Sequence, residues 1–166
     1  LGVKRNDEVI TPPNAFIAST AAIVHLGAKP IFADVKEDQS IDPKEIEKKI
    51  NLNTKAIMPV HLSGNPCDMD QIKNISKKYK IPIIEDAAQA IGSKYKNFFL
   101  GTIGEIGCFS AHPLKNLNAL GDAGYMVTNN KNFANKAKLL RNHGIEKRNK
   151  ILNFGYVSRM DNFQAA

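Results

Sequence analysis

Short apolar runs alternate with amphipathic segments along most of this chain. The apolar runs predict six strands, at residues 7–10, 29–35, 56–61, 81–84, 107–110 and 125–128. Apolar positions at helical spacing predict helices at 16–26, 68–79 and 132–142, and the pair Asp42 and Pro43 predicts the start of another. Because strands and helices alternate over short links, we expect an α/β fold with a mostly parallel sheet and helices on both faces.

Residues 93–105 depart from this alternation. They lack a helical period and contain Gly101 and Gly104 around a short apolar run, which predicts a hairpin or loop between the strands at 81–84 and 107–110. No repeat or flexible linker divides the chain, so we expect one domain. The chain begins without Met, and a helical pattern is only starting at its last residues, so we expect a fragment of a longer protein.

The composition narrows the function classes. The 166 residues carry a formal net charge of +7, but the lysines lie mainly on helices whose other face is apolar, which favours a solvated basic surface over nucleic-acid binding. Cys67 and Cys108 lack the spacing of a zinc site or a disulfide framework, so reduced cytosolic thiols are expected. The longest apolar stretch, 15–26, is too short to span a bilayer.

Two of the predicted strands, 81–84 and 107–110, stop abruptly at polar residues. If these strands are neighbours in the sheet, their ends bring together four polar side chains, those of Asp86, Gln89, Ser110 and Lys115. Ligands of open α/β sheets bind outside the carboxyl ends of the strands, so we expect the chemistry of this protein at that edge.

Two of these residues have both structural and chemical interpretations. Lys115 is either a solvated surface lysine or an amine held among partly buried groups, where it can act as a nucleophile. Asp86 is either an ion-pair partner or helix cap, or a carboxylate that keeps a ligand's ring nitrogen protonated. At a separation of about 4 Å and an effective dielectric of about 20, that second interaction is worth on the order of 4 kcal/mol.

Several motifs in register resemble one enzyme family. The chain is similar to the DegT/DnrJ/StrS family of pyridoxal-phosphate-dependent sugar aminotransferases at 9–12 with Phe16, 27–35, 85–90, Phe109 and Ser110 with Lys115, 140–144, and 158–161 with 164–166. The resemblance implies a fold-type-I aminotransferase large domain, of which residues 1–166 are a part, without the N-terminal segment and the C-terminal small domain.

The resemblance also implies roles for individual residues. Lys115 stands at the position of the Schiff-base lysine that holds pyridoxal 5'-phosphate and moves a proton. Asp86 matches the partner of the pyridinium nitrogen, and Gln89 the residue beside the ring oxygen. Ser110 matches a phosphate ligand and Phe16 the aromatic residue on the ring face. The plainer alternatives are a strand-end cap for Ser110 and an ordinary core aromatic for Phe16.

Three further positions are less decisive. Ser19, in the helix at 16–26, offers a hydroxyl near the expected site, although a serine in a helix needs no function. His61 ends a predicted strand at the same edge, and a hydrogen-bonded strand-end histidine explains it equally well. Val157 stands where the family commonly has an asparagine that reaches the phosphate of the partner subunit's cofactor, and valine cannot donate that hydrogen bond.

The expected function is amino transfer to a nucleotide-linked keto sugar, with an amino acid, most simply glutamate, as donor. The resemblance implies a homodimer with shared active sites. From the cysteines, the charge pattern and the length of the apolar stretch, we expect a cytoplasmic protein with no nucleic-acid or membrane partner. A sugar dehydratase of the same family has histidine in place of the lysine, so Lys115 argues against it. An aminotransferase of a cyclitol or other keto compound remains an alternative, as does a non-catalytic regulatory or nucleic-acid-binding relative.

Overall fold

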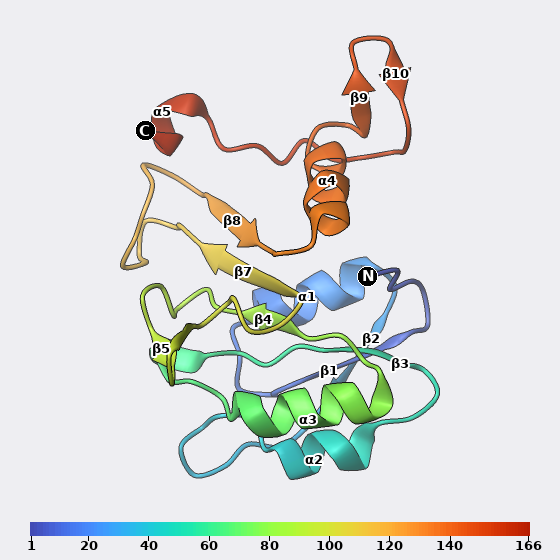
Figure 1. The fold of residues 1–166 in the computed structure, drawn as a ribbon. Coiled ribbons are helices and arrows are strands. Elements are labelled where there is room, and N and C mark those ends of the chain that lie inside the picture. Colours follow the sequence, from blue (N-terminus) through green and yellow to red (C-terminus); the bar gives the residue numbers. More distant parts are fainter.

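A single twisted sheet organises the computed structural model, which describes residues 1–166 (Figure 1). The first half contains β1 (Glu8–Thr11), β2 (Lys29–Phe32) and β3 (Thr54–Ile57), all parallel, in the order β2-β1-β3. The second contains β4 (Ile84–Asp86), β7 (Ile106–Ser110) and β8 (Gly124–Val127), in the order β4-β7-β8, with only β8 antiparallel. Parallel bridges from Ile57 to Ile83 and from Val60 to Asp86 join the halves, so the predicted mostly parallel sheet is confirmed.

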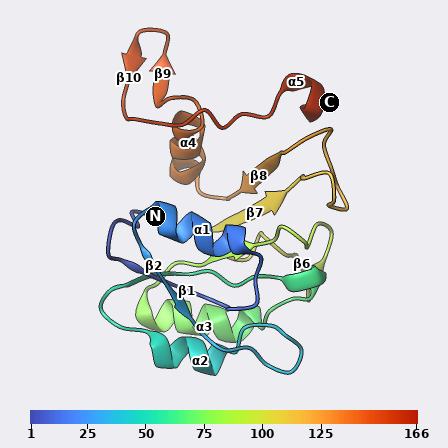
Figure 2. The same cartoon turned by 180° about the vertical axis from the view of Figure 1, so that it is seen from behind.

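Helices cover both faces of this sheet, as predicted. Helix α1 (Ile17–His25) lies on one face, and α2 (Pro43–Lys49) and α3 (Met69–Tyr79) lie on the other (Figures 1 and 2). The helix ends follow the sequence signals. The Asp42 carboxylate accepts a hydrogen bond from the Lys44 backbone N–H at 2.8 Å, and Gly27 ends the first helical segment with a φ of +72°.

The two larger of three core clusters lie on opposite faces of the sheet, and the third contains Ala87, Ala90 and Leu100. Ile83 belongs to the larger cluster, under α2 and α3, whereas Ile84 packs against the smaller cluster, which contains Ile23 of α1. Successive side chains of a strand alternate between faces, so Glu85 shares the α3 face with Ile83, and Asp86 shares the α1 face with Ile84.

Three strands differ from their predicted bounds by three residues or more, and a proline explains two of these differences. Strand β2 ends at Phe32 instead of Val35, which forms only an isolated bridge to Ile41. Strand β4 starts at Ile84 instead of Ile81, and β3 ends at Ile57 instead of continuing to His61. Pro82 and Pro59 have no N–H to donate, so the regular ladder excludes them, although their carbonyls still accept from Ile57 and Asp86.

The remaining elements are short. A 3-10 turn η1 (Leu62–Gly64) follows β3, and β5 (Lys94–Tyr95) with β6 (Phe98–Phe99) forms the hairpin expected within 93–105. Beyond β8 come α4 (Lys131–Leu140), the hairpin of β9 (Ile145–Lys147) and β10 (Lys150–Ile151), and α5 (Asn162–Ala165), on the side of the sheet away from α2 and α3 (Figure 2). The β9–β10 hairpin was not predicted, because its charged sequence has no apolar alternation.

Candidate active site

The ends of β4 and β7 lie side by side, as the two polar-tipped runs predict. The strands pair in parallel with Asp86 opposite Cys108, so Ser110 lies two residues further along the neighbouring strand. The chain then turns through the 111–123 loop, which carries Lys115, before β8 pairs back onto β7. Two of the predicted site residues, Asp86 and Ser110, therefore lie at adjacent strand ends, and Lys115 lies in the loop that follows.

The Asp86 carboxylate is oriented by two donors. The Ser19 hydroxyl of α1 donates to Asp86 Oδ2 at 2.5 Å, and the Ala88 backbone N–H donates to Oδ1 at 3.1 Å. A turn and not a helix follows Asp86, so the helix-cap interpretation is wrong, and the second bond lies within that turn. No ion pair of the chain includes Asp86. The side chain is half-buried, which leaves a fixed carboxylate edge at the rim of the sheet, available to a cationic ligand group.

Gln89 is exposed just beyond Asp86, and its amide orientation is set by one contact. The Ser63 backbone N–H donates to Gln89 Oε1 at 2.6 Å, so the oxygen is engaged and the amide nitrogen keeps its two donors for another group. Ser63 has a φ of +53°, a left-handed conformation uncommon for residues other than glycine, and this turn places its N–H against Gln89.

Ser110 and Lys115 occupy the two ends of a short turn after β7. The His112 backbone N–H donates to Ser110 Oγ at 3.3 Å, which leaves the serine hydroxyl proton free to donate. The Lys115 backbone is fixed by its N–H to the His112 carbonyl, 2.8 Å, and by the Asn118 side chain, which donates to the Lys115 carbonyl. The Lys115 side chain is half-buried, and its amine takes part in none of the ion pairs.

Phe16 lies at the N-terminal end of α1 with 70% of its surface exposed. The core-aromatic interpretation of Phe16 is therefore wrong. Ser19, one turn later on the same helix, holds Asp86, so the start of α1 borders the same strand end. An exposed aromatic ring in this place is free to pack against a planar ligand.

A fully buried pair lies behind these residues, on the α3 face of the sheet. His61 Nε2 lies 3.0 Å from Glu85 Oε2, and His61 Nδ1 accepts from the Cys67 backbone N–H, so Nε2 carries the proton and donates. Burial alone raises the pKa of Glu85, but the bonds from His61, Gly104 and Gly101 outweigh it and hold the pKa below its ordinary value. The interpretation of His61 as a hydrogen-bonded histidine is confirmed, although β3 ends four residues before it.

Val157 is 67% exposed and pairs with Asn142 through an antiparallel bridge. The Asn142 side chain is occupied in turn, because Arg159 Nη1 donates to its Oδ1 at 3.0 Å. No residue of the β4 or β7 strand ends is bonded to this segment, so the position discussed from the sequence lies outside the cluster around Asp86.

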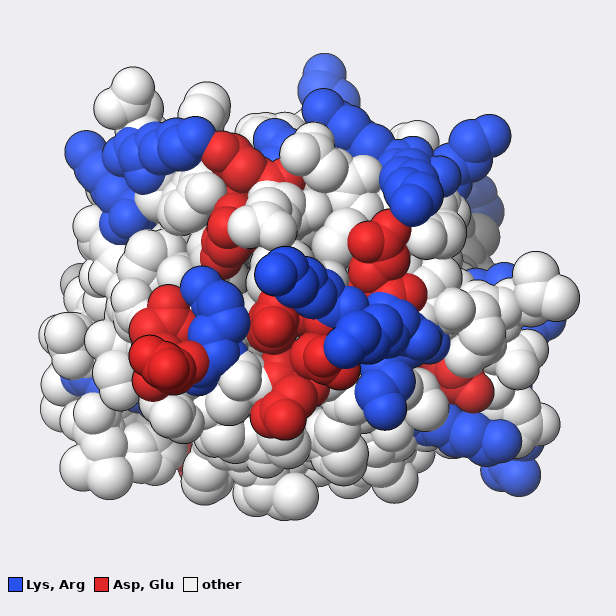
Figure 3. Space-filling view, turned by 90° about the horizontal axis from the view of Figure 1, so that it is seen from below, with Lys and Arg blue, Asp and Glu red and all other residues white.

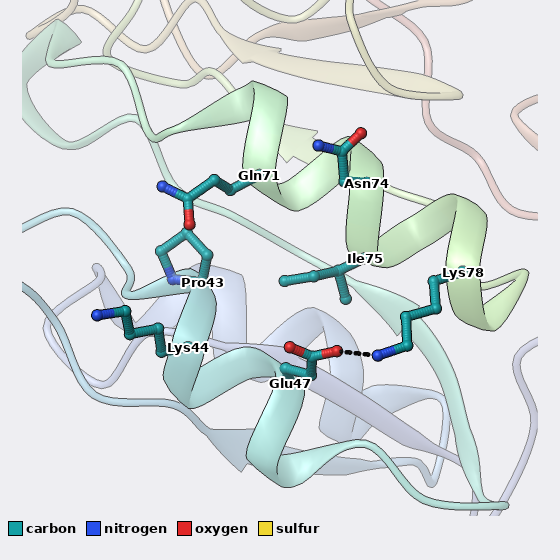
Figure 4. A pocket seen from close by; sticks show the side chains of 7 residues that line it. All are labelled: Pro43, Lys44, Glu47, Gln71, Asn74, Ile75 and Lys78. Atoms are coloured by element: carbon teal, nitrogen blue, oxygen red, sulfur yellow. Dashed lines mark hydrogen bonds and ion pairs between the residues drawn. The ribbon is translucent and has the colours of Figure 1, made fainter.

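A separate groove of about 260 Å³ lies between α2 and α3 (Figure 4). Its lining is mostly polar and partly self-paired, since Lys78 Nζ contacts Glu47 Oε1 at 2.7 Å. The same face of the molecule intermixes basic and acidic side chains instead of gathering one sign of charge (Figure 3). A nucleic-acid site requires a continuous basic surface, which this face does not provide.

The chain contains no helix that is both long and apolar enough to cross a membrane. It also contains no group of three or more His, Cys, Asp or Glu side chains arranged to hold a metal ion.

Comparison with known proteins decides the family. The family described as the DegT/DnrJ/EryC1/StrS aminotransferase family matches residues 1–166. The chain belongs to this aminotransferase family. Its strand order and the ordered motifs around Asp86 and Lys115 therefore have a common origin with those of the family.

Two curated relatives in the family are named for different functions, one as a regulatory protein and one as a transaminase. The pleiotropic regulatory protein of Geobacillus stearothermophilus is 43% identical over 166 residues, which cover 99% of this chain and 45% of that protein. The dTDP-3-amino-3,4,6-trideoxy-alpha-D-glucose transaminase of Streptomyces venezuelae is 39% identical over 167 residues, covering 100% of this chain and 44% of that protein. The chain thus spans less than half the length of these aminotransferase-family relatives.

A solved structure supports the fold. NtdA of Bacillus subtilis, with bound cofactor PMP, superposes with a TM-score of 0.91 at 39% identity, covering 99% of this chain and 38% of that one. Structures this similar share the fold-type-I aminotransferase architecture, so the fold class expected from the sequence is confirmed.

Sequence reasoning underestimated two residues of the site. The sequence requires no function of Ser19, yet Ser19 is the donor that orients Asp86, and the sequence predicts no role for Glu85, which is completely buried. A signal for Glu85 was present, since an acid directly after a buried apolar run must find donors. No comparable signal existed for Ser19, whose partner lies 67 residues away.

Proposed function

We propose that the protein to which this chain belongs is a pyridoxal-phosphate-dependent aminotransferase that transfers an amino group from an amino acid, glutamate being the simplest donor, to a nucleotide-linked keto sugar. Residues 1–166 form part of its cofactor-binding large domain. The observation that carries the proposal is the oriented Asp86 carboxylate on β4, next to the strand whose following turn presents the unpaired amine of Lys115.

The residues present fit the cofactor in their donor and acceptor chemistry. Asp86 offers a fixed carboxylate to a protonated ring nitrogen, because its two protein donors hold that carboxylate in place. Gln89 offers amide donors to the ring oxygen, because its own oxygen is already engaged by Ser63. Ser110 offers a hydroxyl proton to a phosphate oxygen.

Phe16 and Lys115 complete the set. The exposed ring of Phe16 fits against one face of a planar cofactor, which also excludes water from that face. Lys115 supplies an amine free of carboxylate partners, on a backbone fixed by His112 and Asn118. An amine without an ion-pair partner can form a covalent bond and exchange a proton, and among the unpaired lysines Lys115 is the one in the loop that follows β7.

The bound cofactor supplies an electron sink for the carbanion formed next to the transferred amine. The chain supplies the rest. Asp86 holds the ring nitrogen in its charged form, Gln89 and Ser110 fix the orientation of the ring and phosphate, and Lys115 holds the cofactor and then moves the proton at the amino carbon.

We also propose a homodimer with shared active sites. Phe154, Tyr156 and Phe163 are strongly exposed aromatic residues in one terminal segment, and such a group of apolar side chains is typical of a protein interface. With Val157 in place of the family's asparagine, the phosphate is held without that side-chain donor. The free thiols of Cys67 and Cys108 support a cytoplasmic location, because thiols stay reduced there.

Two other functions are alternatives to this proposal. Amino transfer to a cyclitol or another keto compound uses the same cofactor residues, so the site around Asp86 does not distinguish it. A regulatory role is suggested by the name of the Geobacillus relative. The combination of Asp86, held by two donors, with an unpaired Lys115 argues against a role without catalysis. A protein that only binds a partner has no need for both residues.

The test is a panel of nucleotide-linked keto sugars incubated with glutamate and the protein in its full length, with the amino sugar detected by mass spectrometry. The proposal predicts an amino sugar from at least one nucleotide-linked substrate, and none with the Lys115→Ala variant. Reaction with small keto acids or cyclitols alone would show that the sugar assignment is wrong. No reaction and no bound cofactor would favour the regulatory role.

A further inference from the structure

The carboxylate of Glu85 gathers four hydrogen-bond donors although no part of the residue is exposed. Oε1 accepts from the backbone N–H groups of Ile103 at 2.6 Å and Gly104 at 2.5 Å. Oε2 accepts from the Gly101 N–H at 2.8 Å and from His61 Nε2 at 3.0 Å. A carboxylate that accepts this many bonds stays ionised in the interior and fixes the direction of every donor.

Three chain segments meet at this carboxylate, and each continues into one of the proposed cofactor contacts. The segment from His61 leads within two residues to Ser63, whose N–H holds Gln89. Strand β4 carries Asp86 directly after Glu85. The segment 101–104 leads into β7, which ends at Ser110.

The backbone couples these segments tightly. The Asp86 N–H donates to the Pro59 carbonyl at 2.9 Å, and the His61 N–H donates to the Asp86 carbonyl at 3.0 Å. On the other side, a Cβ added at Gly107 would lie 1.9 Å from the Gly101 carbonyl oxygen, so the 101–104 segment lies directly against β7. A shift of any of these segments is therefore transmitted to the strand ends.

We propose that Glu85, oriented by His61, is a positioning residue that sets the relative placement of Asp86, Gln89 and Ser110 for the cofactor. The inference rests on the proposed function, and it assigns a role to a pair that does not touch the cofactor. An apolar side chain fills the same space without the desolvation cost of a buried carboxylate, but it cannot bind the N–H groups of His61 and of the 101–104 segment and so tie both to β4. Positioning accounts for an acid at this place, whereas core packing alone does not.

The experiment measures the affinity for pyridoxal phosphate by absorbance titration of the cofactor-free protein in its full length, with the free energy of unfolding measured in parallel. In Glu85→Gln, an NH₂ group faces at least one pair of donors. In His61→Leu, the bond to Glu85 is lost, whereas in His61→Gln the amide nitrogen still donates to it. Ile46→Ala, at a core residue of α2, is the control for lost stability without a change to the hydrogen bonds of this pair.

Positioning predicts that Glu85→Gln and His61→Leu weaken cofactor binding on the order of tenfold, as removal of orienting groups does at metal sites. It predicts near-wild-type affinity for His61→Gln and for Ile46→Ala at temperatures where each is folded. If Glu85→Gln does not fold, the two His61 variants decide the question.

Equal affinity in His61→Leu and His61→Gln, or an equal loss in Ile46→Ala, would overturn the positioning role and leave the proposed function intact. A wild-type protein that does not bind pyridoxal phosphate would overturn both.

Discussion

Replacing Ser19 with alanine removes the hydroxyl that donates to Asp86 Oδ2 at 2.5 Å, while Ala88 continues to hold Oδ1. Hydrogen bonds to charged groups contribute about 1.5–3 kcal/mol. Because Asp86 is only half-buried, water can replace part of the lost bond, so we expect the free energy of unfolding to fall by about 1–2 kcal/mol.

The effect on cofactor binding follows from the freedom that Asp86 gains. With one of its two anchors removed, the carboxylate must be immobilised when the cofactor binds, at a cost of about 0.5–1.5 kcal/mol for one side chain. This corresponds to a dissociation constant for pyridoxal phosphate that is about 2- to 10-fold higher in Ser19→Ala. Ser19→Thr keeps the hydroxyl and should recover most of the affinity. The assay is absorbance titration of the cofactor-free protein, with denaturant unfolding alongside.

Ser76→Ala is the matched control. Ser76 also donates its hydroxyl from a helix, to the Ile81 carbonyl at 2.6 Å, but it lies on α3, away from Asp86. We expect Ser76→Ala to lose comparable stability with an unchanged dissociation constant. The reasoning is refuted if Ser19→Ala binds the cofactor as tightly as Ser76→Ala does.

Three further changes test other parts of the site. Phe16→Ala should change the free energy of unfolding by less than about 0.5 kcal/mol, because the ring is 70% exposed, yet weaken pyridoxal phosphate binding about 2- to 10-fold in a titration. Val157→Asn should leave the free energy of unfolding unchanged, because Val157 is also exposed. It should tighten cofactor binding in the dimer by about tenfold, which is what one hydrogen bond to the phosphate contributes. An unchanged affinity would show that the phosphate lies elsewhere. The pKa of Glu85 lies below its ordinary value of 4.5. The ionised carboxylate therefore stabilises the folded state fully above about pH 4.5, and this stabilisation is lost as the pH falls through the lowered pKa. The free energy of unfolding of Glu85→Gln should depend less on pH below about 4.5, as measured by denaturant titration at several pH values.

The elements whose signals are local could be read from the sequence. Asp42 caps α2 and Gly27 ends the α1 segment as expected, because a cap and a glycine act within a few residues of themselves. The strand boundaries at Pro59 and Pro82 were less accurate, because the apolar pattern continues through a proline while the hydrogen-bond ladder does not. The β9–β10 hairpin was missed for the opposite reason, since its charged residues form a ladder without an apolar face.

In the candidate site, too, the features with local sequence signals could be predicted and those that depend on distant residues could not. The strand pairing that brings Asp86 and Ser110 together followed from two apolar runs with polar ends. The groups that orient Asp86 and Glu85 could not be predicted from the sequence, because they come from distant parts of the chain. Ser19 reaches Asp86 across 67 residues, and Glu85 reaches His61 across 24. Only the folded backbone decides which face of β4 each of the neighbouring acids occupies.

The assignment of Lys115 as the covalent cofactor residue is the central claim, and one measurement tests it directly. The protein in its full length is incubated with pyridoxal phosphate, treated with borohydride to fix any cofactor bound to a lysine amine, and digested for peptide mass spectrometry. We predict the added mass of the reduced cofactor on Lys115 and on no other of the chain's lysines. Modification of a different lysine, or none under conditions where the cofactor is bound, would contradict the assignment.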